Sequence, residues 1–332
     1  MTLFVIMLMV FSVKKSCCHL SSVKTKNMKR IDVIPYGCSA GGQVSGSERG
    51  ALDLKQNGLI ERLQSSTLDI KWQYDPKEIY DTDFGKKAHE NLPPLGSQER
   101  KEIVLWHCRR IQNDVLKALK KGTLPLTIGG DHAMAAGSIS AVAKAKNAYG
   151  RTGVIWIDAH PDLNTPDTSI SQALHGMPLA ALVGMGDENY VSLTGNEPVI
   201  RYDSIVYIGI RDIDPGEQDY IDRFGITAFT MDDVNRLGID NVLEQAKAII
   251  TKDTDAQVIS IDLDGFDPED VPAVGSPVPH GLKPETTLPA LKKLMKEIDF
   301  DLIEIAEYNP MLAGRDKTRD FIEELLKTLL SD

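Results

Sequence analysis

Residues Val154–Pro166 read VIWIDAHPDLNTP. The first four form an apolar run of the kind that makes a buried strand, and this run ends abruptly at Asp158, His160 and Asp162. Side chains at alternate positions of an extended chain point to the same side, so these three polar groups share one face. Carboxylates held close together repel one another and are costly to bury. The stretch therefore predicts a core strand that ends in a group of metal ligands.

From Ile31 onward the chain alternates short apolar runs with amphipathic stretches. The expected strands are Ile31–Pro35, Pro125–Ile128, Gly153–Asp158, Ile205–Ile210, Val258–Asp262 and Asp301–Ala306. The expected helices are Gln98–Lys121, Ala133–Asn147, Asn241–Thr251, Pro284–Ile298 and Arg315–Leu330. Asp75–Gly96 is polar and contains Pro93 and Pro94, so we expect a long surface loop there. The alternation predicts an α/β fold with a mainly parallel sheet that is covered on both faces.

Length and composition are those of an ordinary globular protein, with 332 residues of which 42% are hydrophobic and 26% charged. This length fits one large α/β domain, with two smaller domains as the alternative. The formal net charge of −11 argues against binding to nucleic acid or to anionic membranes. Cys17, Cys18, Cys38 and Cys108 form no CxxC pair, which argues against a disulfide framework or a structural zinc site. Reduced thiols in a cytoplasmic protein are the expected state.

The N-terminal segment Met1–Val13 is apolar but too short to span a membrane comfortably. It resembles the apolar part of a signal peptide, although no positive charge precedes it. Met28 is a plausible second start, because MKRIDVIPYG opens directly into a strand. We therefore expect residues 1–27 to lie outside the fold, as an extension or a misassigned start, and residues 28–332 to form the domain. A real targeting segment is the alternative, and it would make the protein secreted or membrane-anchored.

Polar residues also lie at or directly after the ends of other expected strands. They occur within Gly129–His132 and Arg211–Glu217 and at Asp262, Asp264, Glu307 and Asn309. A parallel sheet brings the carboxyl ends of its strands to one edge, where ligands bind. We therefore expect four carboxylates and two imidazoles to converge on one pocket. These six ligands are His132, Asp158, His160, Asp162, Asp262 and Asp264.

Four neighbouring aspartates cannot all stay ionised without cations. Two divalent ions supply the compensating charge, and six ligands with bridging carboxylates suit ions about 3.5–4 Å apart. An oxygen-rich set with two imidazoles and no thiolate favours manganese over zinc, with nickel and cobalt as open alternatives. Water between two such ions loses a proton near neutral pH and becomes a strong nucleophile. The ligand set therefore predicts metal-dependent hydrolysis, a chemistry that phosphatases, nucleases and aminopeptidases also perform.

Six motifs occur in order along the chain. They are GGDH at Gly129–His132, DAHPDLNTP at Asp158–Pro166, HGMP at His175–Pro178, RDIDPGE at Arg211–Glu217, SIDLDGFDP at Ser260–Pro268 and EYNP at Glu307–Pro310. Together they resemble the ureohydrolase family, and most closely its arginases. The resemblance implies a three-layer α/β/α sandwich with a parallel, eight-stranded sheet. It also implies hydrolysis of L-arginine to L-ornithine and urea, two manganese(II) ions, and a homo-oligomer that is a trimer or hexamer.

The resemblance also implies roles for individual residues. One metal ion would be held by His132, Asp158, Asp162 and Asp262, and the other by His160, Asp158, Asp262 and Asp264. Asp162 would pass a proton to the leaving amine, and His175 would exchange protons with solvent, a task that suits its pKa. Glu307 would pair with the guanidinium group, for which a bidentate fork is the natural geometry.

The far end of the substrate also has matching positions. Asn164 and Ser171 match residues that hydrogen-bond the α-carboxylate in arginases, and Asp214 matches the residue that recognises the α-amino group. Glu217 and Ser276 are likewise placed at the substrate. Because agmatine has no α-carboxylate, these matches favour L-arginine as the substrate.

Three departures from the arginase pattern leave every metal ligand in place. Ser171–Gly176 reads SQALHG where SGNxHG is usual, so Ala173 lacks an amide near the substrate. Gly275–Gly281 reads GSPVPHG, which puts His280 where glycine permits a tight turn, and we expect it to reshape the pocket rim. Ala133 replaces a common serine. The alternatives are a ureohydrolase acting on agmatine, a guanidino acid or formiminoglutamate, and a non-catalytic arginase-like binding protein.

Overall fold

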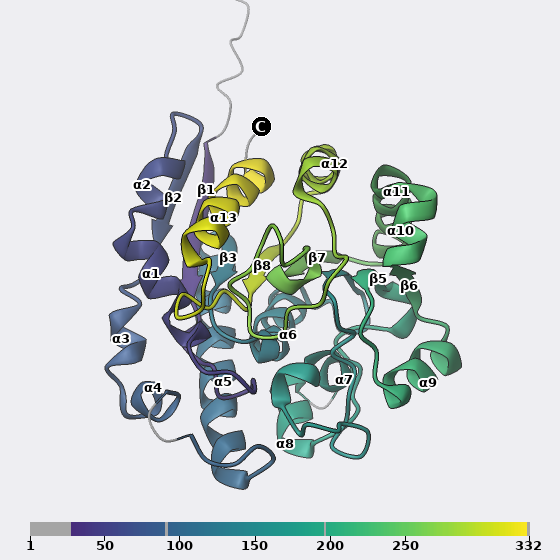
Figure 1. Ribbon diagram of the computed structural model, residues 1–332, viewed down its shortest axis with the longest axis horizontal. Coiled ribbons are helices and arrows are strands. Elements are labelled where there is room, and N and C mark those ends of the chain that lie inside the picture. Colours follow the sequence, from purple (N-terminus) through teal and green to yellow (C-terminus); the bar gives the residue numbers. More distant parts are fainter. Residues whose placement is uncertain (1–27, 90–91, 196, 331–332) are drawn as a thin grey trace, which may run out of the picture.

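A computed structural model describes residues 28–89, 92–195 and 197–330, and within these residues the strands form one eight-stranded sheet (Figure 1). The strands are β1 Lys29–Pro35, β2 Leu68–Trp72, β3 Leu124–Ile128, β4 Thr152–Ile157, β5 Ile205–Ile210, β6 Thr227–Thr230, β7 Ala256–Asp262 and β8 Leu302–Ala306. Their order across the sheet is β2-β1-β3-β8-β7-β4-β5-β6, and every neighbouring pair is parallel. The predicted parallel α/β sheet is therefore confirmed.

Helices cover both faces of this sheet, which makes three layers (Figure 1). The longer helices are α1 Gly50–Gln56, α5 Gln98–Lys120, α6 Ala135–Lys146, α9 Pro215–Phe224, α10 Met231–Leu237, α11 Ile239–Ile250, α12 Pro284–Glu297 and α13 Arg315–Leu330. The shorter ones are α2 Leu59–Leu63, α3 Lys77–Tyr80, α4 Asp83–Lys87, α7 Pro178–Leu182 and α8 Glu188–Val191. Helices α1, α2 and α10–α13 pack on one face, and α5–α9 pack on the other.

Strand β4 shows why the central runs are apolar without alternation. Ile155 and Ile157 belong to the core on one face of the sheet, and Val154 and Trp156 belong to the core on the other. All four side chains are fully buried. A central strand of a parallel sheet is covered on both faces, so both of its side-chain sets must be hydrophobic.

The six expected strands and five expected helices are present, with ends that differ from the expected ones by at most two residues. Strands β2 and β6, at the two edges of the sheet, are additional to those expected from apolar runs. The prediction of a long surface loop over Asp75–Gly96 was wrong, because its described residues include α3 and α4. Thr82 caps α4 by accepting from the Gly85 amide at 2.8 Å, and Ile79 of α3 is buried. Helices of four or five residues are too short to show a clear apolar period.

Residues 1–27 lie outside the described part of the chain, so the expectation for them stays untested. Among the described residues, no helix has both the length and the apolar character needed to cross a bilayer. Strand β1 begins at Lys29 and pairs with β2 and β3. Every strand of the described sheet therefore begins after Met28.

A chain that begins at Met28 is expected to fold and to bind divalent metal as the full chain does. All six expected ligands follow β1 in the sequence, and β1 itself is intact in this shorter chain. Melting temperature and bound metal, measured side by side for the two chains, should agree. An insoluble or metal-free short chain beside a soluble, metal-binding full chain would show that the N-terminal segment is part of the fold.

Candidate active site

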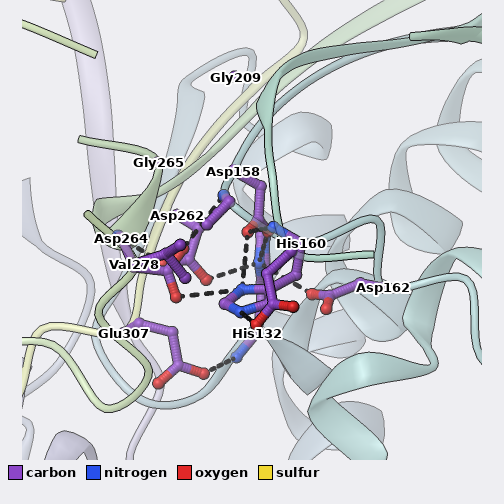
Figure 2. Close-up of polar contacts among 12 residues, drawn as sticks. His132, Asp158, His160, Asp162, Gly209, Asp262, Asp264, Gly265, Val278 and Glu307 are labelled. Carbon is purple, nitrogen blue, oxygen red and sulfur yellow. Dashed lines mark hydrogen bonds and ion pairs between the residues drawn. The ribbon is translucent and has the colours of Figure 1, made fainter. Parts of the chain in front are cut away.

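Four neighbouring strands at the centre of the sheet, β3, β8, β7 and β4, end at one place. His132 follows β3, Glu307 follows β8, Asp262 ends β7 and Asp158 follows β4. Because parallel strands point the same way, their carboxyl ends bring these side chains together, as Figure 2 shows. The convergence that we expect from the sequence is therefore present.

His132 is surrounded by three of the expected carboxylates. Its Nδ1 atom lies 3.1 Å from Asp158 Oδ2, 3.3 Å from Asp162 Oδ2 and 3.0 Å from Asp262 Oδ2 (Figure 2). All four residues are buried. The ligands expected for one of the two ions therefore form one compact group.

His160 forms a second group beside the first. Its Nδ1 atom lies 3.4 Å from Asp158 Oδ1 and 3.4 Å from Asp264 Oδ2. Asp158 thus faces one histidine with each of its carboxylate oxygens. The ligand atoms of His132, Asp158 and Asp262 lie within 4.8 Å of one another, and so do those of Asp158, His160 and Asp264.

Negative charge accumulates in these two groups, and the titration behaviour reflects it. Burial, together with the Asp264 and Asp158 carboxylates, raises the pKa of Asp262 well above its usual range. Burial and repulsion also raise the pKa of Asp264, to about 6. Burial opposes a charge on the His132 imidazole, but the carboxylates around it raise its pKa well above the usual value. Bound cations would relieve the same repulsion.

The donor set fits a pair of divalent cations. It consists of carboxylate oxygens and two imidazole nitrogens, and the described thiols of Cys38 and Cys108 are not in either group. Such a set suits hard or borderline ions such as manganese(II). Burial and neighbouring carboxylates raise the pKa values of Asp162, Asp262 and Asp264, whereas His132 and His160 lower that of Asp158, so nearby positive charge stabilises the ionised carboxylates of this cluster.

The His132 ring is held from behind by residues that the sequence reasoning did not single out. Its Nε2 atom lies 2.8 Å from Ser260 Oγ, and the Ser260 hydroxyl donates to Glu304 Oε1 at 2.9 Å. The ring stacks on Trp156 with 4.0 Å between centroids, and Trp156 Nε1 donates to Asp158 Oδ2 at 2.9 Å. These contacts turn Nδ1 toward the carboxylates, as supporting residues do in metal sites.

Two of the carboxylates expected in the site have an unusual backbone conformation. Asp162 has φ of 51° and Glu307 has φ of 68°, in the left-handed region that residues other than glycine rarely adopt. Such conformations cost about 1–3 kcal/mol each and persist where surrounding contacts enforce them. For Glu307, one such contact is its amide, which donates to the Gly130 carbonyl at 2.8 Å. Surrounding contacts therefore stabilise a strained backbone at the positions where these two side chains point toward the site.

Glu307 forms an ion pair beside the cluster. Its Oε1 atom accepts from the His132 amide at 2.9 Å and lies 3.0 Å from His175 Nδ1. Burial opposes charge on both partners, but their pairing raises the pKa of His175 to about 9 and lowers that of Glu307. Glu307 is therefore an ionised carboxylate that can pair with a cationic group.

A cavity of about 320 Å³ opens over the ligand groups. It is lined by all five residues expected at the far end of a substrate, namely Asn164, Ser171, Asp214, Glu217 and Ser276. It is also lined by His160, Asp162, His175, Asp262 and Asp264. Gln43, Ile170, Gly176 and Asp212 complete the lining. Gln43 and Ile170 carry no motif signal, whereas Asp212 lies within the RDIDPGE motif.

Two departures from the arginase pattern lie at positions with left-handed backbone. Gln172 stands where glycine is usual and has a left-handed φ of 59°. Its side-chain amide donates to the carbonyls of Pro166 and Ser169, both at 2.8 Å, which offsets the strain. His280 is also left-handed, with φ of 65°, but it is exposed and does not line the cavity. The expectation that His280 reshapes the pocket rim therefore stays a prediction.

Arg211 ties the pocket wall to the ligand cluster. Its guanidinium donates to the carbonyl oxygens of Asp264 at 2.7 Å, Val278 at 2.7 Å and Pro279 at 3.0 Å. The loop that carries Ser276 is thereby fixed to the backbone of a candidate ligand. Multiple donors in a rigid plane make arginine suited to this task, which lysine could not perform.

Comparison with known proteins shows which family shares this sequence and fold. The family model described as the arginase family matches residues 30–331. An arginase of Bacillus caldovelox is 36% identical over 307 residues, which cover 92% of this chain and 99% of that relative. The solved structure of the Bacillus caldovelox arginase matches with a TM-score of 0.83 over the same shares of the two chains. An arginase of Entamoeba histolytica, solved with L-ornithine, is 30% identical and matches 92% of this chain and 100% of that chain with a TM-score of 0.78.

Asp264→Ala is expected to remove most of the metal from the His160 group. Asp264 is one of two carboxylates 3.4 Å from His160 Nδ1, and loss of even a supporting residue lowers metal affinity about 10–100-fold. Elemental analysis after dialysis against a limiting concentration of manganese should show about half of the wild-type content.

The matched control is Asp299→Ala, which removes an exposed carboxylate elsewhere on the surface. This control should keep the wild-type metal content. If both variants bind as much manganese as the wild-type chain, the ligand cluster has been placed on the wrong residues.

Proposed function

The chain belongs to the arginase family, and we propose that it hydrolyses L-arginine to L-ornithine and urea with two manganese(II) ions. One observation carries the proposal. The cavity that opens onto the metal-ligand cluster also has, in Asn164 and Asp214, a hydrogen-bond donor and an acceptor for an amino acid head group. A substrate with a cationic end and an amino acid end fits both.

The ligand cluster would hold the metal pair. Its members are His132, Asp158, His160, Asp162, Asp262 and Asp264. When bound, two divalent ions act as Lewis acids and lower the pKa of water, which makes a nucleophile available at neutral pH. The role of the protein is then to hold the guanidinium carbon beside the ligand cluster and to transfer protons.

Glu307 is the residue that orients the guanidinium group. Its carboxylate is buried, ionised and located beside His132, so it can accept two parallel N–H bonds from a planar guanidinium. The present ion pair with His175 would be exchanged for, or shared with, this substrate contact. Exclusion of water from the buried carboxylate strengthens the pairing.

Two further residues are suited to proton transfer. Asp162 lines the cavity beside His132, and burial and the Asp158 carboxylate raise its pKa, so it can hold a proton for the leaving amine. His175 also lines the cavity, with its side chain 17% exposed. An imidazole in that position can exchange protons between the reacting groups and solvent.

Manganese as the resident metal is favoured by the oxygen-rich ligand set. From the resemblance to the family, we also propose that the enzyme is homo-oligomeric and cytoplasmic.

L-Arginine is expected to be preferred over agmatine by about 10² in kcat/KM, which corresponds to about 2.7 kcal/mol. Two or three hydrogen bonds to a charged carboxylate supply that difference. A urea-release assay with both substrates tests this preference.

The metal requirement is tested with the same assay on protein treated with a chelator and reloaded with manganese, nickel, cobalt or zinc. Chelation should abolish urea release, and manganese should restore it best.

Asn164→Ala should shrink the preference for L-arginine and leave the metal content unchanged, because Asn164 touches no metal ligand among its described hydrogen bonds. Equal or faster hydrolysis of agmatine by the wild-type enzyme would point to a different ureohydrolase. Undiminished turnover in protein shown to be metal-free would end the hydrolytic mechanism altogether.

A further inference from the structure

The side chain of Asn164 is held on both sides by polar partners. It is buried, and its Nδ2 atom donates to Asp214 Oδ2 at 3.0 Å. Its Oδ1 atom accepts from the Thr168 hydroxyl at 2.9 Å. Asn164 and Asp214 line the cavity, whereas Thr168 does not.

The hydroxyl of Thr168 has its own partners, and they direct its proton. It accepts from the Thr165 amide at 2.9 Å, which occupies one lone pair. The hydroxyl proton has one short acceptor, Asn164 Oδ1 at 2.9 Å, and the hydroxyl and carbonyl oxygens of Thr165 are farther away, at 3.3 and 3.4 Å. Thr168 therefore acts as a donor toward Asn164.

These two partners select one of the two orientations of the amide. In the observed orientation the Asn164 NH2 group faces the Asp214 carboxylate, and the carbonyl faces a hydroxyl proton. The flipped amide would put an oxygen against the Asp214 carboxylate oxygen and an N–H group against the Thr168 hydroxyl proton. An amide orientation is set by such networks, and unpaired buried polar groups are costly.

Thr168 also packs closely against the start of helix α9. Gly216 lies in the first turn of α9, two residues after Asp214, and a Cβ atom there would sit 2.6 Å from Thr168 Cβ. Glycine at this position lets the threonine pack against the start of the helix. The contact links the loop that carries Asn164 to the helix whose cap is Asp214.

We propose that Thr168 is a positioning residue for substrate selection, which holds an N–H group of Asn164 toward the α-carboxylate of the substrate. The inference rests on the proposed function, since it concerns the amino acid end of L-arginine. Asn164 then offers a donor for the carboxylate next to the Asp214 acceptor for the α-ammonium group. Agmatine keeps the ammonium group but has no α-carboxylate, so it should not sense the orientation of this amide.

Thr168→Val tests the hydroxyl, because valine keeps the shape of threonine and lacks the donor. The manganese-loaded variant should lose about 3- to 10-fold in kcat/KM for L-arginine, the effect of one net hydrogen bond. The loss should appear in KM, with kcat within about twofold, and kcat/KM for agmatine should be unchanged. Affinity for L-ornithine, measured by calorimetry, should fall by the same factor. This binding measurement probes the amino acid end of the pocket without turnover.

Thr168→Ser is the matched control, because it keeps the hydroxyl and should behave as the wild-type enzyme does. Thr168→Ala replaces the valine variant if that protein does not fold. In an Asn164→Ala background, Thr168→Val should have no further effect on L-arginine, since the amide that it orients is gone.

Equal losses for L-arginine and agmatine, or a valine variant that matches the wild type on both, would overturn the role of Thr168 while L-arginine preference stands. A wild-type enzyme without any L-arginine preference would instead remove the proposed function and this inference together.

Discussion

Mutual repulsion of buried carboxylates is the constraint on which this structure depends. Asp158, Asp162, Asp262 and Asp264 are each at most 7% exposed, and they form ion pairs with the histidines His132 and His160. A low-dielectric interior makes such proximity costly unless cations compensate for it. The rest of the molecule supports the cluster. Buried central strands anchor the ligands, and Trp156, Ser260 and Glu304 fix the His132 ring.

Sequence reasoning located the candidate ligands because each follows a local rule. An apolar run predicts a central strand, and polar residues directly after it predict the edge where ligands bind. The edge strand β2, with LDIKW, and the edge strand β6, with TAFT, have no comparable run. The support of His132 by Ser260 and Glu304 joins neighbouring strands β7 and β8 through side chains. Only the assembled sheet reveals such contacts, as it does for Gln43 and Ile170 in the cavity lining.

The residues proposed to select the substrate lie in a different part of the pocket from the candidate metal ligands. The loop between Asn164 and Gln172 is held by its own side chains, with Thr168 bonded to Asn164 and Gln172 bonded to two carbonyls. None of these bonds involves a candidate metal ligand. Changes in this loop can therefore alter the amino acid end of the pocket while the metal cluster keeps its geometry. The departures at Gln172 and Ala173 lie in this region.

A crystal structure of the manganese-loaded protein, with anomalous scattering measured at the manganese absorption edge, tests the central claim most directly. The account predicts two anomalous peaks about 3.5–4 Å apart. One should lie beside His132 Nδ1 and the other beside His160 Nδ1, with the Asp158 carboxylate between them. A single peak, or two peaks away from these histidines in enzyme that releases urea, would contradict the two-cation origin of the cluster.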